Sequence, residues 1–177
     1  QGTRPDALLL SRERFTAEES GLLGAVFLDG SENASVTFAR CCRPIPGDAI
    51  VGYLGRGEGL AVHASECAVA RRLHHKDSER FIAVEWSDEP VRLFEASVVV
   101  SVQNGQGVLA RVAAAFATAE SDITHVDMGD EAAQDTHDLR FVVAVRDRVH
   151  LDSVLKAVNR TASVLQAVRI RPANSAA

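Results

Sequence analysis

The feature of this 177-residue sequence that most constrains its fold is an alternation of apolar β-rich runs and amphipathic helices in its second half. The helical spacing is clearest after Asp147, where Leu151, Val154, Leu155 and Val158 fall at positions i, i+3, i+4 and i+7. An earlier helix and four β-rich runs complete the pattern, at 108–119 and at 94–102, 123–128, 139–145 and 164–170. The predicted order of elements over residues 92–171 is therefore βαββαβ.

This order corresponds to a ferredoxin-like layout, in which both helices pack on one face of a four-stranded antiparallel sheet. Asp147 is expected to cap the second helix, because its carboxylate can accept N–H bonds at a helix start. The edge strands of such a sheet pair readily, so we expect a homodimer through side-by-side sheets. The predicted fold class is α+β, with a small cysteine-bearing β-rich module preceding this unit.

The smaller module is predicted over residues 34–86. A two-residue period from Val36 to Cys41 is typical of a strand, and Pro44–Asp48 has the composition of a turn. Ser65 is expected to cap a short helix that runs to Leu73. A glycine-rich hairpin and a closing strand complete the module, at 50–54 with 60–63 and at 81–86. Outside the two units, residues 1–33 are interpreted as a connector with short helices and 172–177 as a disordered tail.

Composition argues against several classes of function. The net charge of -5 and the aromatic content of 5% do not favour non-specific nucleic-acid binding, which needs basic and stacking side chains. No apolar run approaches the roughly 20 residues that span a bilayer, so no membrane partner is expected. Two of the three cysteines are adjacent, which makes a poor disulfide framework and suits a reducing cytoplasm.

One string of residues is similar to a known family. Residues Val36–Asp48 read VTFARCCRPIPGD and resemble the conserved-cysteine module of long RelA/SpoT homologues, as do Ile50–Gly52, Gly57–Gly59, Val62–His63 and Cys67. That module is also called a zinc-finger-like or ribosome-intersubunit domain. In the family an ACT domain follows it, and the βαββαβ unit is similar to one. The resemblance covers residues 34–171 and points to the C-terminal regulatory region of a (p)ppGpp synthetase/hydrolase.

The resemblance implies a non-catalytic regulatory segment that senses amino-acid or ribosome status and controls upstream synthetase and hydrolase domains. The sequence has neither the His-Asp metal motif of the hydrolase nor a synthetase domain, and no paired acid/base or nucleophile constellation, so no enzymatic activity is expected. The implied partners are those catalytic domains, ribosomal RNA and a branched-chain amino acid. Two alternatives remain open: a free-standing ACT amino-acid sensor and a zinc-dependent RNA-binding module.

A candidate zinc site consists of Cys41, Cys42, His63 and Cys67. Adjacent residues of a strand point to opposite faces, so only one of Cys41 and Cys42 is expected to reach a shared ion. A fourth ligand would then come from His74, His75 or water. The alternative is that the cysteines pack as small hydrophobic side chains.

Five arginines of the same module could make a local basic surface. The resemblance implies that they face ribosomal RNA phosphates, with Arg56 on the hairpin tip. The alternative is that they are ordinary solvated charges. The five are Arg40, Arg43, Arg56, Arg71 and Arg72.

The resemblance to an ACT domain also implies an effector site in the loop after the first strand of the second unit. Backbone N–H groups at a helix N-terminus suit a carboxylate, and glycine permits a close approach. Asp122 and Ile123 would form the opposing wall, often in a partner subunit, and Asp122 could supply the acidic charge that the neutral Asn104 lacks. The alternative is that the glycines only make the turn and that the domain dimerises or docks. The loop residues are Asn104, Gly105, Gln106, Gly107, Val108 and Leu109.

Overall fold

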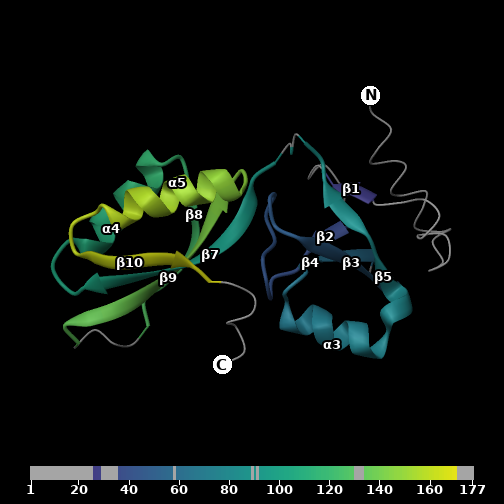
Figure 1. The fold of residues 1–177 in the computed structure, drawn as a ribbon. Coiled ribbons are helices and arrows are strands. Elements are labelled where there is room, and N and C mark those ends of the chain that lie inside the picture. The colour runs from purple at the N-terminus through teal and green to yellow at the C-terminus, as the bar shows by residue number, and fades with distance from the viewer. Residues whose placement is uncertain are drawn as a thin grey trace. The chain divides into compact units, whose positions relative to one another are not determined.

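The computed structural model describes residues 26–28, 36–57, 59–88, 90, 92–129 and 134–170. The expected short helices before residue 26 and the expected tail at 172–177 lie outside these residues. The chain divides into two compact units, whose boundary in the sequence falls between Arg92 and Leu93 (Figure 1). Each unit is built around its own four-stranded sheet.

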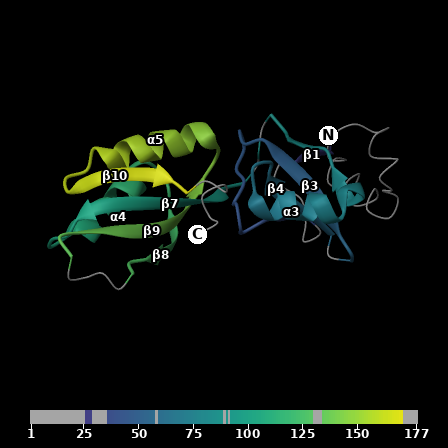
Figure 2. The same cartoon turned by 60° about the horizontal axis from the view of Figure 1, so that its bottom comes forward.

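The second unit has the predicted βαββαβ order. Its strands form one antiparallel sheet in the order β10-β7-β9-β8, and both helices lie on the same side of it (Figures 1 and 2). The ferredoxin-like prediction is therefore confirmed. The elements are β7 (Phe94–Gln103), α4 (Val108–Thr118), β8 (Ile123–Asp127), β9 (Thr136–Val145), α5 (Arg148–Asn159) and β10 (Val164–Arg169).

The core of this unit follows from two periodicities. In β7 every second residue from Phe94 to Val102 is buried, and the residues between them are half-buried or exposed. Each helix adds one buried stripe at helical spacing, and the rings of Phe116 and Phe141 lie 5.0 Å apart between α4 and β9. The buried helical residues are Val108, Val112 and Phe116 in α4 and His150, Leu151, Val154 and Val158 in α5.

The second helix begins as predicted. The carboxylate of Asp147 accepts a hydrogen bond of 2.7 Å from the backbone N–H of His150, which is the bond expected of an N-cap aspartate. The imidazole of His150 then joins two elements, because its Nδ1 accepts from the N–H of Arg146 at 3.0 Å and its Nε2 lies 2.9 Å from the carbonyl oxygen of Ala119. With Nδ1 accepting, Nε2 carries the proton and donates to that carbonyl.

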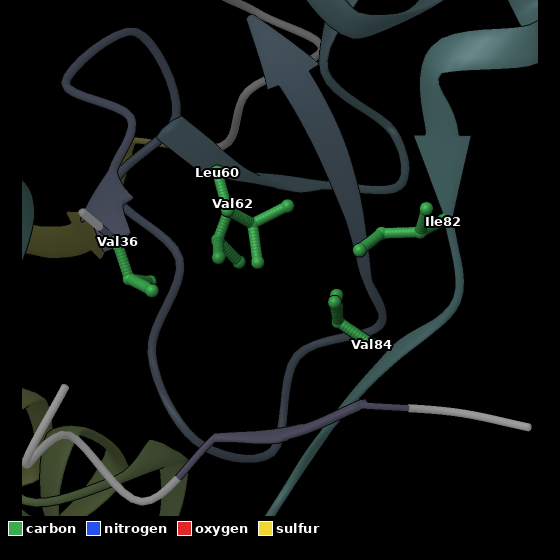
Figure 3. Packing of buried hydrophobic residues seen from close by; sticks show 5 residues of the cluster. All are labelled: Val36, Leu60, Val62, Ile82 and Val84. Atoms are coloured by element: carbon green, nitrogen blue, oxygen red, sulfur yellow. The ribbon is translucent and has the colours of Figure 1, made fainter. Parts of the chain in front are cut away.

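The first unit is a mixed sheet in the order β2-β4-β3-β5, with a helix and a second, two-stranded sheet beside it. The predicted hairpin is present, and β2 adds to it in parallel with β4. The main core cluster comprises Val36, Leu60, Val62, Ile82 and Val84 (Figure 3). The elements are β1 (Val26–Leu28), β2 (Val36–Phe38), β3 (Ile50–Gly55), β4 (Gly59–Ala64), α3 (Ala68–Lys76), a 3-10 helix (Ser78–Arg80), β5 (Phe81–Ile82) and β6 (Val84–Trp86).

Three local expectations for this unit differ from the structure. Strand β1 lies within the predicted connector and pairs in parallel with β6. The closing strand is interrupted after Ile82, so that β5 joins the larger sheet and β6 joins β1. The prediction that Ser65 caps α3 is wrong, because the N–H of Ser65 still bonds to the carbonyl of Ala49 and the helix begins three residues later, with Cys67 at its N-cap and no side-chain cap. Among the described helices, none combines the length and the apolar character needed to cross a membrane.

Candidate metal centre and effector loop

Four side chains from three separate elements meet at one end of the first sheet. The Sγ atom of Cys41 lies 3.4 Å from Nδ1 of His63, 3.6 Å from Sγ of Cys67 and 4.0 Å from Sγ of Cys42. The distance from Sγ of Cys42 to Nδ1 of His63 is 3.9 Å, and the four ligand atoms all lie within 4.8 Å of one another. The structure therefore brings together all four residues that the sequence suggested, which we call the Cys3His cluster.

The adjacent cysteines both reach the cluster because they lie in a turn. Strand β2 ends at Phe38, and the N–H of Arg43 bonds back to the carbonyl of Ala39 at 2.9 Å. Arg43 has a positive φ of 43°, which closes the turn. The expectation that Cys41 and Cys42 point to opposite faces of a strand is therefore wrong.

The other two ligands are fixed by regular elements. His63 lies near the end of β4, opposite Val51 of β3, and its side chain is buried. Cys67 is the N-cap of α3 and is 2% exposed. The cluster thus ties the turn after β2 to the end of β4 and to the start of α3.

Burial favours the uncharged form of each cluster side chain that it perturbs. Burial raises the pKa of the Cys42 thiol well above its usual range, and partial burial of the sulfur of the otherwise exposed Cys41, together with the neighbouring Cys67, raises the pKa of the Cys41 thiol. Burial also lowers the pKa of His63, which keeps the imidazole neutral. A bound cation would reverse the preference of the thiols, because thiolate is the form that binds a metal. The backbone N–H of Ala64 donates to Sγ of Cys42 at 3.2 Å and would support such a thiolate.

The dimensions of the cluster fit a tetrahedral zinc ion. Zn–S bonds of about 2.3 Å and Zn–N bonds of about 2.0 Å place ligand atoms roughly 3.5 to 3.8 Å apart in a tetrahedron. Four of the six distances between ligand atoms, at 3.4 to 4.0 Å, cover this range, and all six are within 4.8 Å. Three sulfurs and one imidazole nitrogen also form a donor set that is common in structural zinc sites. The residues present therefore fit the ion, and no ligand from His74 or His75 is needed.

Four of the five candidate RNA-facing arginines flank the cluster along the chain. Arg40 and Arg43 lie on either side of the cysteine pair, and Arg71 and Arg72 lie on α3 soon after Cys67. Arg43 is half-buried and the other three are exposed. The last turn of α3 adds three exposed basic residues that were not among the RNA-facing candidates: Lys76, and His74 and His75, which were considered only as a fourth zinc ligand.

Arg56 lies apart from these residues. It is exposed at the turn between β3 and β4, whereas His63 lies near the opposite end of β4. The four residue-to-residue steps from Gly59 to His63 correspond to roughly 14 Å along a strand. The structure therefore does not place the hairpin tip beside the cluster.

The candidate effector loop joins β7 to α4, as predicted. Asn104 is held by two bonds to the segment before β9, from its N–H to the carbonyl of Asp135 at 2.8 Å and from its amide to the carbonyl of Gln134 at 3.2 Å. Gly107 is the N-cap of α4, with a φ of 75° that favours glycine, and no side chain caps the helix. The first N–H groups of a helix have no partner within it, so this end of α4 can donate to an anion.

The side chains of the loop differ in what they can offer. Asn104, Gly105, Gln106 and Gly107 are exposed, and Leu109 is half-buried. The side chain of Val108 is buried in the core of the second unit, so only its backbone remains for a ligand.

Comparison with known proteins matches both units to described families. Residues 26–87 match the family model of the RelA/SpoT RIS domain, and residues 91–169 match that of the ACT domain. The chain carries the RIS and ACT domains of RelA/SpoT proteins. The first match begins at β1, upstream of the boundary at residue 34 that the sequence suggested.

Curated relatives agree with this assignment. The bifunctional (p)ppGpp synthase/hydrolase SpoT of Escherichia coli K12 is 33% identical over 148 residues, which cover 84% of this chain and 21% of SpoT. The GTP pyrophosphokinase of Streptomyces coelicolor is 32% identical over 167 residues, which cover 92% of this chain and 19% of that protein. The bifunctional (p)ppGpp synthase/hydrolase RelA of Mycobacterium tuberculosis is 30% identical over 151 residues, which cover 84% of this chain and 20% of that protein. The chain spans about a fifth of the length of these relatives.

Within one ACT domain the two halves of the expected effector site lie at opposite ends of the sheet. Gln103, just before the loop, pairs with Thr136 at the start of β9. Ile123 pairs with Val143, and the carbonyl of Asp122 accepts from the N–H of Ala144. Seven residues of β9 separate the two places, which is roughly 23 Å. A single chain therefore does not bring Asp122 and Ile123 to the loop.

The ACT domain contains one residue at the loop that sequence reasoning missed. The guanidinium of Arg111 donates to the carbonyl of Gln106 at 3.4 Å and to the hydroxyl of Ser163 at 3.3 Å. It thereby joins the effector loop to the turn between α5 and β10. The sequence did contain a signal for this contact. Arg111 is four residues after Gly107, and a side chain on a helix lies back over the preceding turn, which here is the effector loop.

Proposed function

We propose that this chain is a non-catalytic regulatory segment of a stringent-response (p)ppGpp synthetase/hydrolase. The observation that carries the proposal is the occurrence of a RIS domain and an ACT domain in one chain, with relatives named as synthases or hydrolases of (p)ppGpp. In this role the two domains sense amino-acid or ribosome status, and upstream domains perform the chemistry. The cytoplasm is the expected compartment, because thiolate ligands persist where the surroundings are reducing.

Turnover assays test the absence of catalysis. The purified chain is incubated with ATP and GTP in one reaction and with (p)ppGpp in another, each with Mg²⁺ and with Mn²⁺. We expect neither synthesis nor hydrolysis above a buffer control. Product that increases with protein concentration would refute the regulatory assignment.

We propose zinc as the ion of the RIS domain, held by the thiolates of Cys41, Cys42 and Cys67 and by Nδ1 of His63. The ion would fix the turn after β2 against α3, and no reaction step is assigned to it. Elemental analysis of protein purified without added metal is expected to give about one equivalent of zinc. Less than about a tenth of an equivalent would remove the four-ligand site. Cys42→Ser should lower the zinc content, and Ser65→Ala is a matched control outside the cluster.

The RIS domain is proposed to face ribosomal RNA through the arginines around the cluster. Support comes from the exposed Arg71 and Arg72 on α3 and from the basic end of that helix. Each phosphate contact steepens the salt dependence of binding, so the double change Arg71→Gln with Arg72→Gln should reduce the slope of log K against log salt by roughly 1 to 2. Arg140→Gln is the control, since Arg140 is exposed on the ACT sheet. An equal slope in both variants would leave these arginines as ordinary solvated charges.

The ACT domain is proposed to bind a branched-chain amino acid at the effector loop, in a site completed by a second copy. The loop residues are Asn104–Leu109, and the partner subunit would contribute Asp122 and Ile123. Leucine, isoleucine and valine are expected to raise the Tm of the chain, because a ligand that binds only the folded state stabilises it. Gln106→Trp should remove this shift, and Gln166→Trp on β10 should not. A shift that survives in Gln106→Trp would place the ligand elsewhere.

The edge strand β8 is the proposed dimer contact. Pairing of β8 with its copy across a twofold axis reverses the partner strand, so that the Asp122 end of the partner lies at the effector-loop end of this chain. The effector loop follows β7, so the distance from β7 to the partner's β8 decides which edge can complete the site. Pairing through β8 leaves three strand spacings between these two strands, about 14 Å, whereas pairing through β10 leaves five, about 24 Å. Val126→Lys on β8 should weaken the dimer in sedimentation experiments. Val168→Lys on β10 is the control, and the reverse result would assign the dimer to β10.

A further inference from the structure

The three cysteines of the RIS domain differ in access to solvent. Cys41 is exposed, whereas Cys42 and Cys67 are 6% and 2% exposed. The cysteines are free, and the Sγ atom of Cys41 lies closer to that of Cys67, at 3.6 Å, than to that of Cys42, at 4.0 Å. The cluster thus combines one accessible thiol with a sheltered thiol in direct contact.

The sequence separation of these two cysteines favours their pairing. Cys41 and Cys67 are 26 residues apart, and they are held by different elements, a turn and a helix N-terminus. Cys41 and Cys42 lie at 4.0 Å, but a bond between adjacent residues closes a small strained ring. The geometry therefore selects Cys67 over Cys42 as the resolving thiol.

We propose that Cys41 and Cys67 form a reversible disulfide in response to peroxide, so that the Cys3His cluster is an oxidation site as well as a metal site. The disulfide requires the two thiols and peroxide but no metal, so it can form in the metal-free chain. For the zinc-loaded chain the inference rests on the proposed metal site, and it adds that the disulfide and the bound zinc cannot be present together.

The chemistry balances in two steps. The sulfur of Cys41 attacks hydrogen peroxide, the O–O bond breaks, and a sulfenic acid and one water form. The sulfur of Cys67 then attacks the sulfenic sulfur, the S–O bond breaks, and the disulfide and a second water form. Two thiols lose two electrons in total, and one peroxide gains them. A dithiol reductant reverses the change by thiol–disulfide exchange.

Oxidation would remove two of the four ligands. Cys42 and His63 alone cannot satisfy a tetrahedral ion, so the zinc would leave as the disulfide forms. The change would also act on α3, because Cys67 is its N-cap and the carbonyl of Cys67 accepts from the N–H of Arg71 at 3.0 Å. The oxidised state therefore alters the start of the helix that carries Arg71 and Arg72.

The test uses the full 177-residue chain, in zinc-loaded and in metal-free form. Each is treated with hydrogen peroxide, and non-reducing peptide mapping identifies the linked cysteines. We expect a Cys41–Cys67 link that a dithiol removes, with one zinc released per link from the loaded form. Cys42→Ser should still form the link, whereas Cys67→Ser should stop at a sulfenic acid on Cys41 that a dimedone probe traps. Far-UV circular dichroism before treatment establishes that each variant is folded.

Three results would overturn the inference. They are a Cys41–Cys42 link, a Cys41 that stays unmodified at peroxide doses that oxidise free cysteine, and dimedone labelling of Cys42 or Cys67 equal to that of Cys41. The zinc proposal is judged separately. A chain that holds no zinc but forms the Cys41–Cys67 link refutes the metal site and retains the oxidation site. A chain that holds zinc but forms no Cys41–Cys67 link, whether zinc-loaded or metal-free, refutes the oxidation site and retains the metal site.

Discussion

Gly52 of β3 has no space for a side chain, and Gly52→Ala is expected to destabilise the RIS domain by about 1 to 3 kcal/mol. A Cβ atom at this position would lie 2.9 Å from Cδ1 of Leu60, 2.9 Å from Cγ1 of Val84 and 3.0 Å from Cγ1 of Ile82. All three neighbours belong to the buried core cluster (Figure 3). Each contact is shorter than ordinary van der Waals separation, and the neighbouring side chains cannot withdraw without displacing others in a close-packed core.

The fluorescence of Trp86 provides the assay. Trp86 is the only tryptophan in the sequence, and it stacks on Phe38 within the same domain, so its signal in urea follows the RIS domain. With a slope of about 1 kcal/mol per molar urea, the unfolding midpoint should fall by about 1 to 3 M. Gly57→Asn is the control within the same domain, because a Cβ there meets nothing within 4 Å and asparagine tolerates its φ of +82°. A change of less than about 0.3 M in Gly52→Ala would refute the steric argument.

Three further outcomes are expected. In metal-free protein the raised pKa of Cys42 keeps its thiol protonated in the folded state, whereas the thiol of the unfolded chain ionises above the ordinary pKa of 9.0. The free energy of unfolding should therefore fall by about 1 kcal/mol for each pH unit above 9.0. The lowered pKa of His63 should cause a similar fall in the free energy of unfolding as the pH drops below 6.5, because only the unfolded chain then takes up the proton. Zinc should abolish the alkaline decline, and a stability of the metal-free form that is flat from pH 7 to 10 would contradict this reasoning. Asp147→Ala removes the cap of α5 and should cost the ACT domain about 1 kcal/mol by thermal unfolding, with Asp152→Ala as an exposed control. Phe116→Ala empties a fully buried site and should cost about 3 to 5 kcal/mol, and a loss below about 1 kcal/mol would mean that the α4 contact with the sheet has been misjudged.

The ACT fold could be predicted from the sequence because its two periods are unambiguous. Apolar residues alternate along β7, and the stripe from Leu151 to Val158 has helical spacing, so the type of each element follows directly. The Asp147 cap could be predicted for the same reason, since the signal lies within four residues of sequence.

The cluster geometry was less accessible from sequence. A two-residue period continues past Phe38 to Cys41, and nothing in the string indicates that the chain leaves the strand after Phe38. The turn depends on a positive φ at Arg43, a conformation that an arginine rarely adopts and that no sequence rule assigns to it. Four candidate ligands could therefore be named, but the adjacent pair was expected to diverge.

Other misses have a common cause in tertiary pairing. The interruption after Ile82 reflects a change of partner from β3 to β1, which is not encoded in the composition of the strand. The place of Asp122 was not a miss, because the sequence analysis already allowed a partner subunit to supply it; what the sequence could not give is the antiparallel register, which puts Asp122 and the effector loop at opposite ends of the sheet.

The position of β7 between β9 and β10 has a consequence for synthesis of the chain. The strands of the RIS domain are complete once Trp86 has been added, but β9 ends 42 residues after β7 does. At about 5 to 20 residues per second, the newly made β7 waits roughly 2 to 8 s for its first neighbour. During this interval a ten-residue strand, half of it apolar residues destined for burial, has no sheet neighbour to cover them.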